Sequence, residues 1–338
     1  MPSVSSLHEA SELLAAAHAE GRPVRIGAEL TTDGLGRIIE HEAGDLTCTV
    51  ESGIRLSALN AELATHGQRL SLDPPGDPTV GALLAENLSG PLRHRFGAAR
   101  DLVLGVTLVL ADGTIASAGG KVVKNVAGYD LARLVCGSQG KLALIGRASF
   151  RLHPLPRASR TIVVGAPRSE LLVAAVSNLL GSRLEPSAAD VLHPGRFAVL
   201  FEGSEAAVDA QVETAERLLR ASENLVTISH EASGANGDGA SRLASASSAG
   251  ADRGLVTICH KESVWDESRR RQGAALGRRR FPPGGLAAAL LSMGEAVVRP
   301  AAGVAYLPVT APDDTAPAVR RLEEAIRALL DPRGVLSG

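Results

Sequence analysis

The stretch TVGALLAENLSGPLRHRFGAARDLVLGVTLVLADGT, residues 79–114, decides the fold of this chain. Its last third contains Leu102–Leu110, which is almost entirely apolar and is typical of a strand buried on both faces. Asp112 and Gly113 form a turn signal that predicts a hairpin with a second strand at Thr114–Ala118. We therefore expect a sheet with this hairpin deep inside it.

The run before that strand, Leu70–Asp101, is dense in Gly, Pro, Ser and Asn. It can be interpreted as a plain surface loop, but long loops inside compact domains are uncommon unless they are functional. Its glycines allow a ligand to approach the backbone closely. Asn87, Ser89 and Arg93 offer polar contacts for phosphate, ribose or a heteroaromatic ring. The run predicts a binding segment.

A second dense run is GGKVVKNVAGYDLARLVCGSQGKLALIG, residues 119–146. It predicts a short helix at Asp130–Val135, with Leu131 and Leu134 buried and Gly137 at its end. That helix leaves four polar side chains unexplained: Lys121, Lys124, Asn125 and Tyr129. For Tyr129, a satisfied core position and a ligand contact both stay open.

The rest of the first half alternates helices and strands. Ser6 and Glu9 fit a capping box at the start of a helix that Gly21 can end. The further expected elements are strands at Pro23–Ile26, Leu46–Val50 and Leu142–Leu152, and a helix spaced by Leu56, Leu59 and Leu63. The prolines of HPLP then mark a domain exit near residue 157.

The rhythm changes after that exit. Strands near 161–165, 190, 197–201 and 225–229 enclose helices at 170–180 and 205–219, in the βαββαβ order of a ferredoxin-like unit. The Gly-, Ser- and Ala-rich residues 232–251 predict a flexible connector. Residues 255–308 can be interpreted as a partial repeat, and Pro317–Leu330 as a final helix.

Composition excludes several classes of function. The 338 residues hold 35 Lys and Arg against 37 Asp and Glu, so no overall field attracts nucleic acid or an anionic membrane. We find no leader-like or bilayer-spanning apolar segment, and expect a cytoplasmic protein. Cys48, Cys136 and Cys259 lie far apart without a CxxC pair, so neither a disulfide framework nor a metal site is expected.

Three common enzyme motifs are nearly matched, but each differs from this sequence at one position. Gly34–Gly36 approaches the dinucleotide fingerprint, but Ile39 stands where its third glycine belongs. Gly119–Lys121 is followed by Val122, so the hydroxyl of a P-loop is missing. Gly137–Gly140 has one residue too few for a nucleophile elbow. No catalytic dyad, carboxylate pair or metal cluster can be assigned.

Both dense runs resemble the FAD domain of the vanillyl-alcohol-oxidase (PCMH-type) family. KNVAGYDL, residues 124–131, is similar in particular to the FAD-binding E subunits of bacterial glycolate oxidases, and DPRGVLSG, residues 331–338, resembles the C-terminal signature of the family. The resemblance implies an α+β fold: a two-subdomain PCMH-type FAD-binding domain with a ferredoxin-like cap domain. We expect the FAD-binding domain at 1–157, the cap at 158–312, and a C-terminal helix at 313–338 returning to the FAD domain.

The resemblance also implies which residues face the cofactor: Pro75, Thr79, Val80, Gly81, Asn87, Ser89, Gly90, Arg93, Gly97, Gly140 and Ile145. One segment departs from the family. Where the family holds the FAD pyrophosphate on a Gly-rich loop, Val24–Leu35 reads VRIGAELTTDGL and is shortened. Ala82, Lys141 and Ala143 also replace usual residues. No histidine lies in the shortened loop, so we expect non-covalent FAD.

Three functions stay open on these residues. The first is an FAD-binding oxidoreductase subunit that transfers hydride from a 2-hydroxy acid such as glycolate to flavin, together with a second flavoprotein subunit and an iron–sulfur subunit that could hold it at a membrane. The second is a non-catalytic structural subunit with a degenerate flavin pocket. The third is a stand-alone oxidase. The intact dense runs favour the first, and the shortened loop favours the second.

Two weaker features are interpreted as solvent-facing. His94 lies between Arg93 and Arg95, where an exposed loop histidine is expected more often than a substrate contact. The basic triplets Arg269–Arg271 and Arg278–Arg280 could form a docking patch for an anionic partner, but charge runs are mostly solvated faces.

Overall fold

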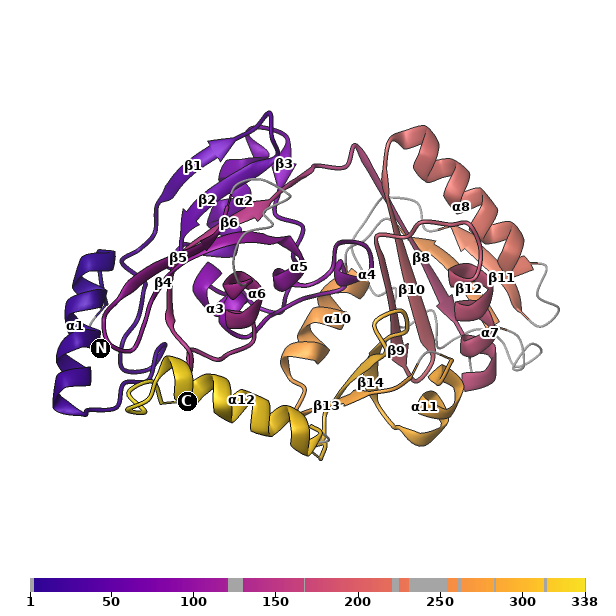
Figure 1. Ribbon diagram of the computed structural model, residues 1–338. Coiled ribbons are helices and arrows are strands. Elements are labelled where there is room, and N and C mark those ends of the chain that lie inside the picture. The colour runs from indigo at the N-terminus through magenta and orange to yellow at the C-terminus, as the bar shows by residue number, and fades with distance from the viewer. Residues whose placement is uncertain are drawn as a thin grey trace. The chain divides into compact units, whose positions relative to one another are not determined.

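The computed structural model describes residues 3–120, 130–166, 168–220, 225–230, 254–259, 263–282, 284–312 and 315–337. The chain divides into two compact units (Figure 1). Unit 1 is built from residues 1–89, 96–155 and 313–338, and unit 2 from residues 90–95 and 156–312. Lys121, Lys124, Asn125, Tyr129 and the predicted connector at 232–251 lie outside the described residues.

Unit 1 contains an antiparallel five-stranded sheet. Its order is β1 (Ile38–Glu42), β2 (Thr47–Glu51), β6 (Leu144–Arg151), β4 (Val103–Val109) and β5 (Ile115–Gly119). The predicted buried strand is β4, in which five of seven residues are buried between β6 and β5. Its hairpin to β5 turns at Asp112, whose carboxylate accepts the Thr114 N–H at 2.9 Å. The buried strand predicted from the apolar run is confirmed, but the hairpin does not lie deep in the sheet, because β5 is an edge strand and none of its residues is buried.

Helices cover both faces of this sheet. The larger core packs α2 (Leu56–Ala64), α3 (Val80–Ala85), α5 (Ala99–Leu102) and α6 (Leu131–Val135) against β2, β4 and β6. A second core packs α1 (Leu7–Glu20) against Val109, Leu144 and the C-terminal residues Val335 and Leu336. Within α6, Ala132 and Val135 are buried while Leu131 and Leu134 are only half-buried, so the sequence prediction named the wrong face.

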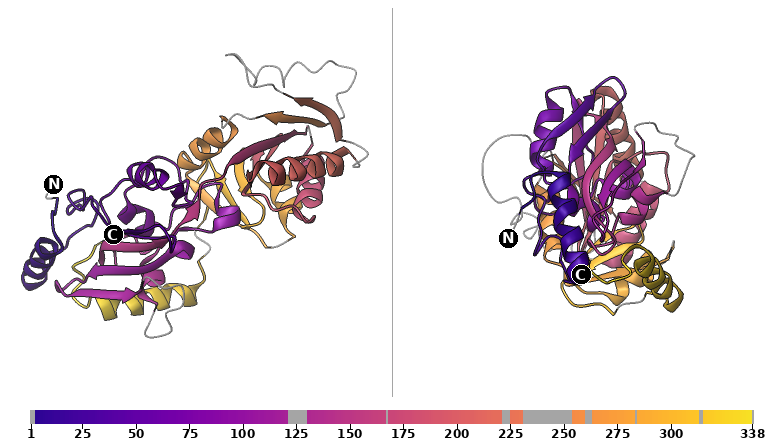
Figure 2. Two further views of the ribbon diagram at one scale, coloured as in Figure 1. Left: turned by 90° about the horizontal axis from the view of Figure 1, so that it is seen from above. Right: turned by 60° about the vertical axis from the view of Figure 1, so that its left-hand side comes forward.

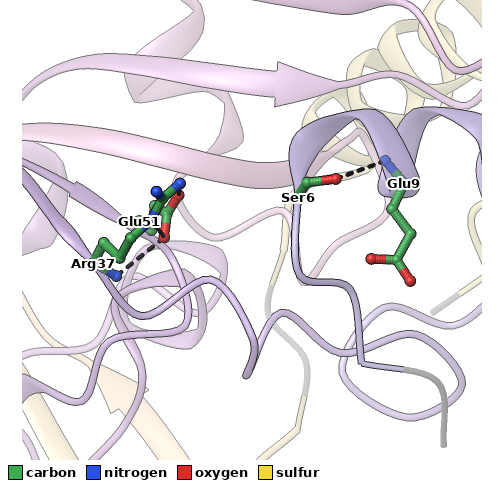
Figure 3. Close-up of polar contacts among 4 residues, drawn as sticks. All are labelled: Ser6, Glu9, Arg37 and Glu51. Carbon is green, nitrogen blue, oxygen red and sulfur yellow. Dashed lines mark hydrogen bonds and ion pairs between the residues drawn. The ribbon is translucent and has the colours of Figure 1, made fainter.

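The start of α1 follows the predicted cap in part (Figure 3). The Ser6 hydroxyl accepts the Glu9 N–H at 3.1 Å. The Glu9 carboxylate bonds to the N–H and hydroxyl of Ser5, at 2.8 and 2.9 Å, and not to Ser6. The predicted strand Pro23–Ile26 is wrong, because this segment forms only isolated bridges. Val24 forms its bridge with Leu336 of the C-terminal segment, and Ile26 forms its bridge with Leu30.

The C-terminal segment closes unit 1. α12 (Pro317–Leu330) matches the predicted final helix, and Leu336 then forms a bridge with Val24. The segment lies beside α1 (Figure 2). There the Arg333 guanidinium donates to the His18 carbonyl at 2.9 Å. Three short elements remain: α4 (Arg93–Phe96), of which residues 93–95 belong to unit 2, and the paired strands β3 (Gln68–Arg69) and β7 (His153–Pro154).

Unit 2 contains an eight-stranded sheet in the order β11-β12-β8-β10-β9-β14-β15-β13. The βαββαβ elements are present as β8 (Ala158–Gly165), α7 (Ser169–Leu180), β9 (Ala188–His193), β10 (Arg196–Gly203), α8 (Glu205–Arg220) and β11 (Leu225–His230). One strand departs from the ferredoxin-like order, because β12 (Gly254–Cys259) lies between β11 and β8 and pairs with both. The segment predicted as a partial repeat thus extends the same sheet.

The remaining elements of unit 2 are α10 (Ser263–Gly273), β13 (Gly277–Arg280), α11 (Leu286–Ser292), β14 (Ala296–Arg299) and β15 (Val304–Leu307). α7, α8 and α11 pack on one sheet face through a large apolar core. α10 packs on the other face through Val264 and Trp265 (Figure 1). Among the described residues, no helix has the length and hydrophobicity needed to cross a membrane.

The C-terminal turn depends on one buried carboxylate. Asp331 is 3% exposed and accepts the N–H groups of Val335 and Leu336 at 2.8 and 2.7 Å. Replacing Asp331 with Ala leaves both donors buried without a partner, and we expect a loss of roughly 2–4 kcal/mol in the free energy of unfolding. Urea denaturation measures it. Glu324→Ala, on the exposed surface of α12, is the control, and equal stability of the two variants would contradict the assignment.

Candidate functional site

The two dense runs of the sequence meet through their backbones. The carbonyls of Leu84 and Ala85, at the end of α3, accept the N–H groups of Gly137 and Gln139 at 3.0 and 2.8 Å. A Cβ on Gly137 would lie 3.6 Å from the Asn87 Cβ, so the turn after α6 contacts the start of the Asn87 loop. The structure therefore places two segments that are distant in sequence side by side in unit 1.

The Asn87 loop is held by its own polar groups. The Asn87 side-chain oxygen accepts the Arg100 N–H at 3.1 Å, and Asn87 has a left-handed backbone with φ of 49°. At the other end, the Asp101 carboxylate accepts the Ala98 N–H at 2.8 Å and lies against Gly97. Both ends of the loop are thus tied to α5. The Asn87 amide is used in this structural role.

The start of α3 presents a close backbone contact. The Thr79 hydroxyl caps the helix by accepting the Ala82 N–H at 3.3 Å, and Gly81 donates its N–H to the Ser52 carbonyl at 2.7 Å. A Cβ on Gly81 would lie 3.2 Å from both the Ser52 Cβ and its carbonyl oxygen. Glycine therefore permits this approach. The sequence prediction included Thr79 and Gly81 but missed Ser52, which follows β2 without any motif.

Ser52 is an orphaned polar group. Its side chain is fully buried, and its hydroxyl has no hydrogen-bond partner. The Ser138 hydroxyl, in the turn that contacts Asn87, is likewise buried and unpaired. Buried hydroxyls of this kind call for a water or a ligand as partner. Both hydroxyls therefore fit a bound polar molecule next to the two dense runs.

The other predicted residues differ in what they can offer. Val80 and Ile145 are 0% and 5% exposed with side chains in the core, so only their backbones could meet a cofactor. Ser89 is buried, and Pro75 is half-buried. Gly90 and Arg93 belong to unit 2. The contact of each with a cofactor stays a prediction.

The shortened loop closes on itself. Gly27 donates its N–H to the Leu30 carbonyl at 2.8 Å, and Ala28, Glu29 and Leu30 donate theirs to the Arg25 carbonyl at 3.2, 2.7 and 3.2 Å. The Glu29 carboxylate accepts the Arg25 N–H at 3.0 Å and forms an ion pair with the Arg25 guanidinium at 3.7 Å. These four N–H groups are the kind of donors that hold a pyrophosphate. The segment does not fit that group, although it lies against Gly140 through Ile26.

Thr32 and Leu35, later in the same loop, pack against Gly53 in the turn after β2. Gly53 donates its N–H to the Leu35 carbonyl at 2.8 Å. A Cβ on Gly53 would lie only 1.9 Å from the Thr32 carbonyl oxygen, so no other residue fits without moving the loop.

An ion pair holds the same junction (Figure 3). The buried Glu51 carboxylate accepts hydrogen bonds from the Arg37 N–H, Nε and Nη2 at 3.0, 3.2 and 2.9 Å. Burial acts to raise the pKa of Glu51, but the hydrogen bonds and charge of Arg37, with the charge of Arg147, outweigh it and lower the pKa. Glu51 is therefore held ionised in the folded protein.

A cavity of about 1060 Å³ lies between the Gly137–Leu142 turn and α12. Its basic side chains outnumber its acidic ones: Arg100, Arg133, Lys141, Arg320 and Arg327 against Asp130, Glu323 and Glu324. Cys136 also lines it, and burial raises the pKa of this thiol to about 12, so it is protonated at neutral pH. None of the predicted cofactor residues lines this cavity.

Comparison with known proteins matches part of the chain to an FAD binding domain and to several relatives. Residues 19–119 match the model of an FAD binding domain. The chain is 35% identical over 199 residues to the glycolate oxidase subunit GlcE of Escherichia coli, covering 57% of this chain and 55% of that one. It is 31% identical over 173 residues to the cytochrome-type D-lactate dehydrogenase 1 of Saccharomyces cerevisiae, covering 50% and 30%.

A solved structure shares the fold across nearly the whole chain. An alkyldihydroxyacetonephosphate synthase superposes with a TM-score of 0.69 and 14% identity, over 98% of this chain and 75% of that one. The match identifies residues 19–119 as an FAD binding domain, and the superposition supports the fold of the chain. The chain is homologous to glycolate oxidase subunits and D-lactate dehydrogenases, of which it spans about half the length or less.

The contact between the loop and Gly53 can be tested by substituting two glycines, one inside the contact and one outside it. Gly53→Ala forces a Cβ against the Thr32 carbonyl, whereas Gly36→Ala, in the same segment, meets nothing within 4 Å. We expect Gly53→Ala to lower the free energy of unfolding by about 1–3 kcal/mol. Gly36→Ala should stay close to wild type. Chemical denaturation of both variants measures the difference in the free energy of unfolding. Similar curves would refute the proposed close contact between Gly53 and the Thr32 carbonyl.

The Arg37–Glu51 pair predicts a pH-dependent contribution to stability. Because the pKa of Glu51 is lowered on folding, its contribution is complete above the ordinary carboxyl pKa and is lost as the pH falls through the lowered value. Glu51→Gln should therefore be less stable than wild type at neutral pH, and the difference should shrink in acid. Urea midpoints across that range measure it. A difference that does not change with pH would count against the ion pair.

Proposed function

We propose that this chain is an FAD-binding subunit of an oxidoreductase that acts on a 2-hydroxy acid such as glycolate. The observation that supports it most directly is the junction of the Asn87 loop with the Gly137 turn, which carries the unpaired Ser138 hydroxyl, together with the unpaired hydroxyl of Ser52, which contacts Gly81 at the start of α3. Relatives named as a glycolate oxidase subunit and a D-lactate dehydrogenase supply the substrate class.

A bound flavin would supply the redox chemistry as the hydride acceptor, and the hydroxyl proton of the substrate would leave to water. The protein would bind the flavin and orient it. Gly81 brings the α3 backbone against Ser52, and the Ser52 and Ser138 hydroxyls are free to donate to a polar group of the cofactor. The Leu84 and Ala85 carbonyls fix the Gly137 turn, so these groups are held in place before binding.

Assembly is part of the proposal. The E. coli relative is named a subunit, which supports a role for this chain within a complex. A second flavoprotein subunit and an iron–sulfur subunit are the partners we propose, because electrons from a reduced flavin need an acceptor. The cytoplasmic location expected from the sequence stays a prediction.

A second candidate is a structural subunit with a degenerate flavin pocket. The closed segment Arg25–Leu30 favours it, because its N–H groups are used internally and the Arg25 guanidinium is paired with Glu29. Each charge-assisted hydrogen bond contributes roughly 1.5–3 kcal/mol. Loss of two or three such bonds costs on the order of 3–9 kcal/mol, or about two to six powers of ten in Kd. FAD binding by the isolated chain should therefore be weak.

The two candidates are separated by comparing FAD with FMN. If the closed loop gives the pyrophosphate no donors, FAD should bind only marginally better than FMN, with Kd values within about 10-fold, because the contribution of the second phosphate is missing. Flavin fluorescence titration of the apoprotein measures both. FAD binding that is tighter by several powers of ten would show that the loop opens, and absence of binding by either flavin would favour the structural subunit.

A further inference from the structure

One face of the unit 2 sheet carries a patch of arginines around a tyrosine. In the register of β13 with β15, Arg278 pairs with Tyr306 and Arg280 with Val304. Because side chains alternate along a strand, Arg278, Arg280 and Tyr306 share one face, and Arg279 projects from the other. We refer to Arg278, Arg280 and Tyr306 as the Tyr306 patch. Arg279 instead donates to the Ser292 hydroxyl at 3.2 Å.

Tyr306 lies between two guanidinium groups. The Arg299 Cζ is 4.9 Å and the Arg278 Cζ 6.0 Å from the centroid of its ring. The Arg299 Nη1 donates to the Tyr306 hydroxyl oxygen at 3.1 Å. Since that oxygen accepts from a cation, the hydroxyl proton is left to donate and is a stronger donor than a free phenol.

Arg299 itself is fixed by a buried network. It is 2% exposed, and its Nε lies 3.3 Å from the Oδ1 of Asp190, which is fully buried. From α10, Gln272 accepts from Arg299 at 2.6 Å, and the Ser268 hydroxyl donates to Asp190. Burying an ion pair contributes little net stability, so its retention is better explained by the position that it imposes. Here that position is the orientation of Tyr306.

Positive charge is in excess around the patch. Partial burial lowers the pKa of Arg278, and the like charges of Arg280, Arg93 and Arg299 lower it further, against an opposing effect of Tyr306. Asp190 is already paired with Arg299. Within the described part of the chain, Arg278 and Arg280 form no ion pair with a carboxylate. A bound anion would relieve this repulsion and accept the donors that the patch presents.

We propose that the Tyr306 patch binds the carboxylate group of a small 2-hydroxy acid. Arg278 and Arg280 supply guanidinium donors, Tyr306 supplies a hydroxyl donor, and Arg299 with Asp190 positions the tyrosine. The planar guanidinium fork matches a carboxylate, which can accept two parallel hydrogen bonds. The identity of the acid rests on the proposed function. The carboxylate site itself rests on the geometry of unit 2.

The experiment measures binding and not turnover, with the full chain at low ionic strength. Glycolate is titrated calorimetrically into wild type and into Arg278→Gln, Arg280→Gln, Tyr306→Phe and Arg279→Gln. We expect Arg278→Gln and Arg280→Gln to weaken glycolate binding about 10-fold or more, the effect of one charge-assisted hydrogen bond. Tyr306→Phe should weaken it several-fold. Arg279→Gln removes the same charge from the same strand but projects from the opposite face, and should leave binding nearly unchanged.

Two further ligands test the chemistry. Glycolamide has the shape of glycolate without its charge and should not bind measurably. Inorganic phosphate should bind more weakly than glycolate. Equal losses for Arg278→Gln and Arg279→Gln, glycolamide binding as tight as glycolate binding, tighter phosphate binding, or no glycolate binding by wild type would each overturn the proposal.

Folding and function are controlled separately. Far-UV circular dichroism during thermal unfolding checks each variant. Arg278→Lys, which keeps the charge and loses the fork, should give an intermediate affinity. Titration of the same preparations with FAD and FMN reports on the proposed function independently: glycolate binding by a chain that binds neither flavin would refute that function and leave the carboxylate site standing.

Discussion

The contact between the Thr32 carbonyl and Gly53 determines how the candidate site in unit 1 is built. Through this contact the C-terminal residues of the shortened loop pack directly on the turn that follows β2. The ion pair between Arg37 and Glu51 stabilises the same packing from the residues next to that contact. The same turn contains Ser52, whose carbonyl receives the N–H of Gly81 and so fixes the start of α3. α3 in turn carries, at its other end, the carbonyls that bind the Gly137 turn. Loop, helix and turn are therefore linked by backbone contacts in series.

This chain of contacts explains why glycines and small residues concentrate here. At Gly53 and Gly81 a Cβ would meet backbone atoms of a neighbouring segment, which cannot move as the end of a flexible side chain can. Substitution at either position would shift a segment and not only a side chain. The buried hydroxyl of Ser52 lies where these segments converge, so a ligand that engages it would be sensitive to all three.

The sequence predicted the elements better than it predicted their details. The apolar run of β4 and the signals of α1 and α12 are local, and each forms close to its expected bounds. The order of strands in unit 2 is not local: nothing in residues 254–259 shows that β12 enters between β11 and β8. Ser52 could not be found either, because its importance comes from Gly81, which approaches it from another part of the chain. The closed hydrogen bonding of Arg25–Leu30 was likewise invisible, since shortening alone does not say where N–H groups point.

The basic triplet Arg278–Arg280 shows the same limit in unit 2. As a sequence it is a charge run, and a solvated face is its ordinary interpretation. The register of β13 against β15 separates its members, so that Arg279 bonds to Ser292 while Arg278 stands beside Tyr306. The distinction is then sharpened by a residue far from the triplet: the buried Asp190 holds Arg299, and Arg299 holds the tyrosine. A buried ion pair has no clear advantage for stability over well-packed apolar side chains. Its presence beneath a half-buried tyrosine and two arginines is therefore best understood as support for a surface that must keep one geometry.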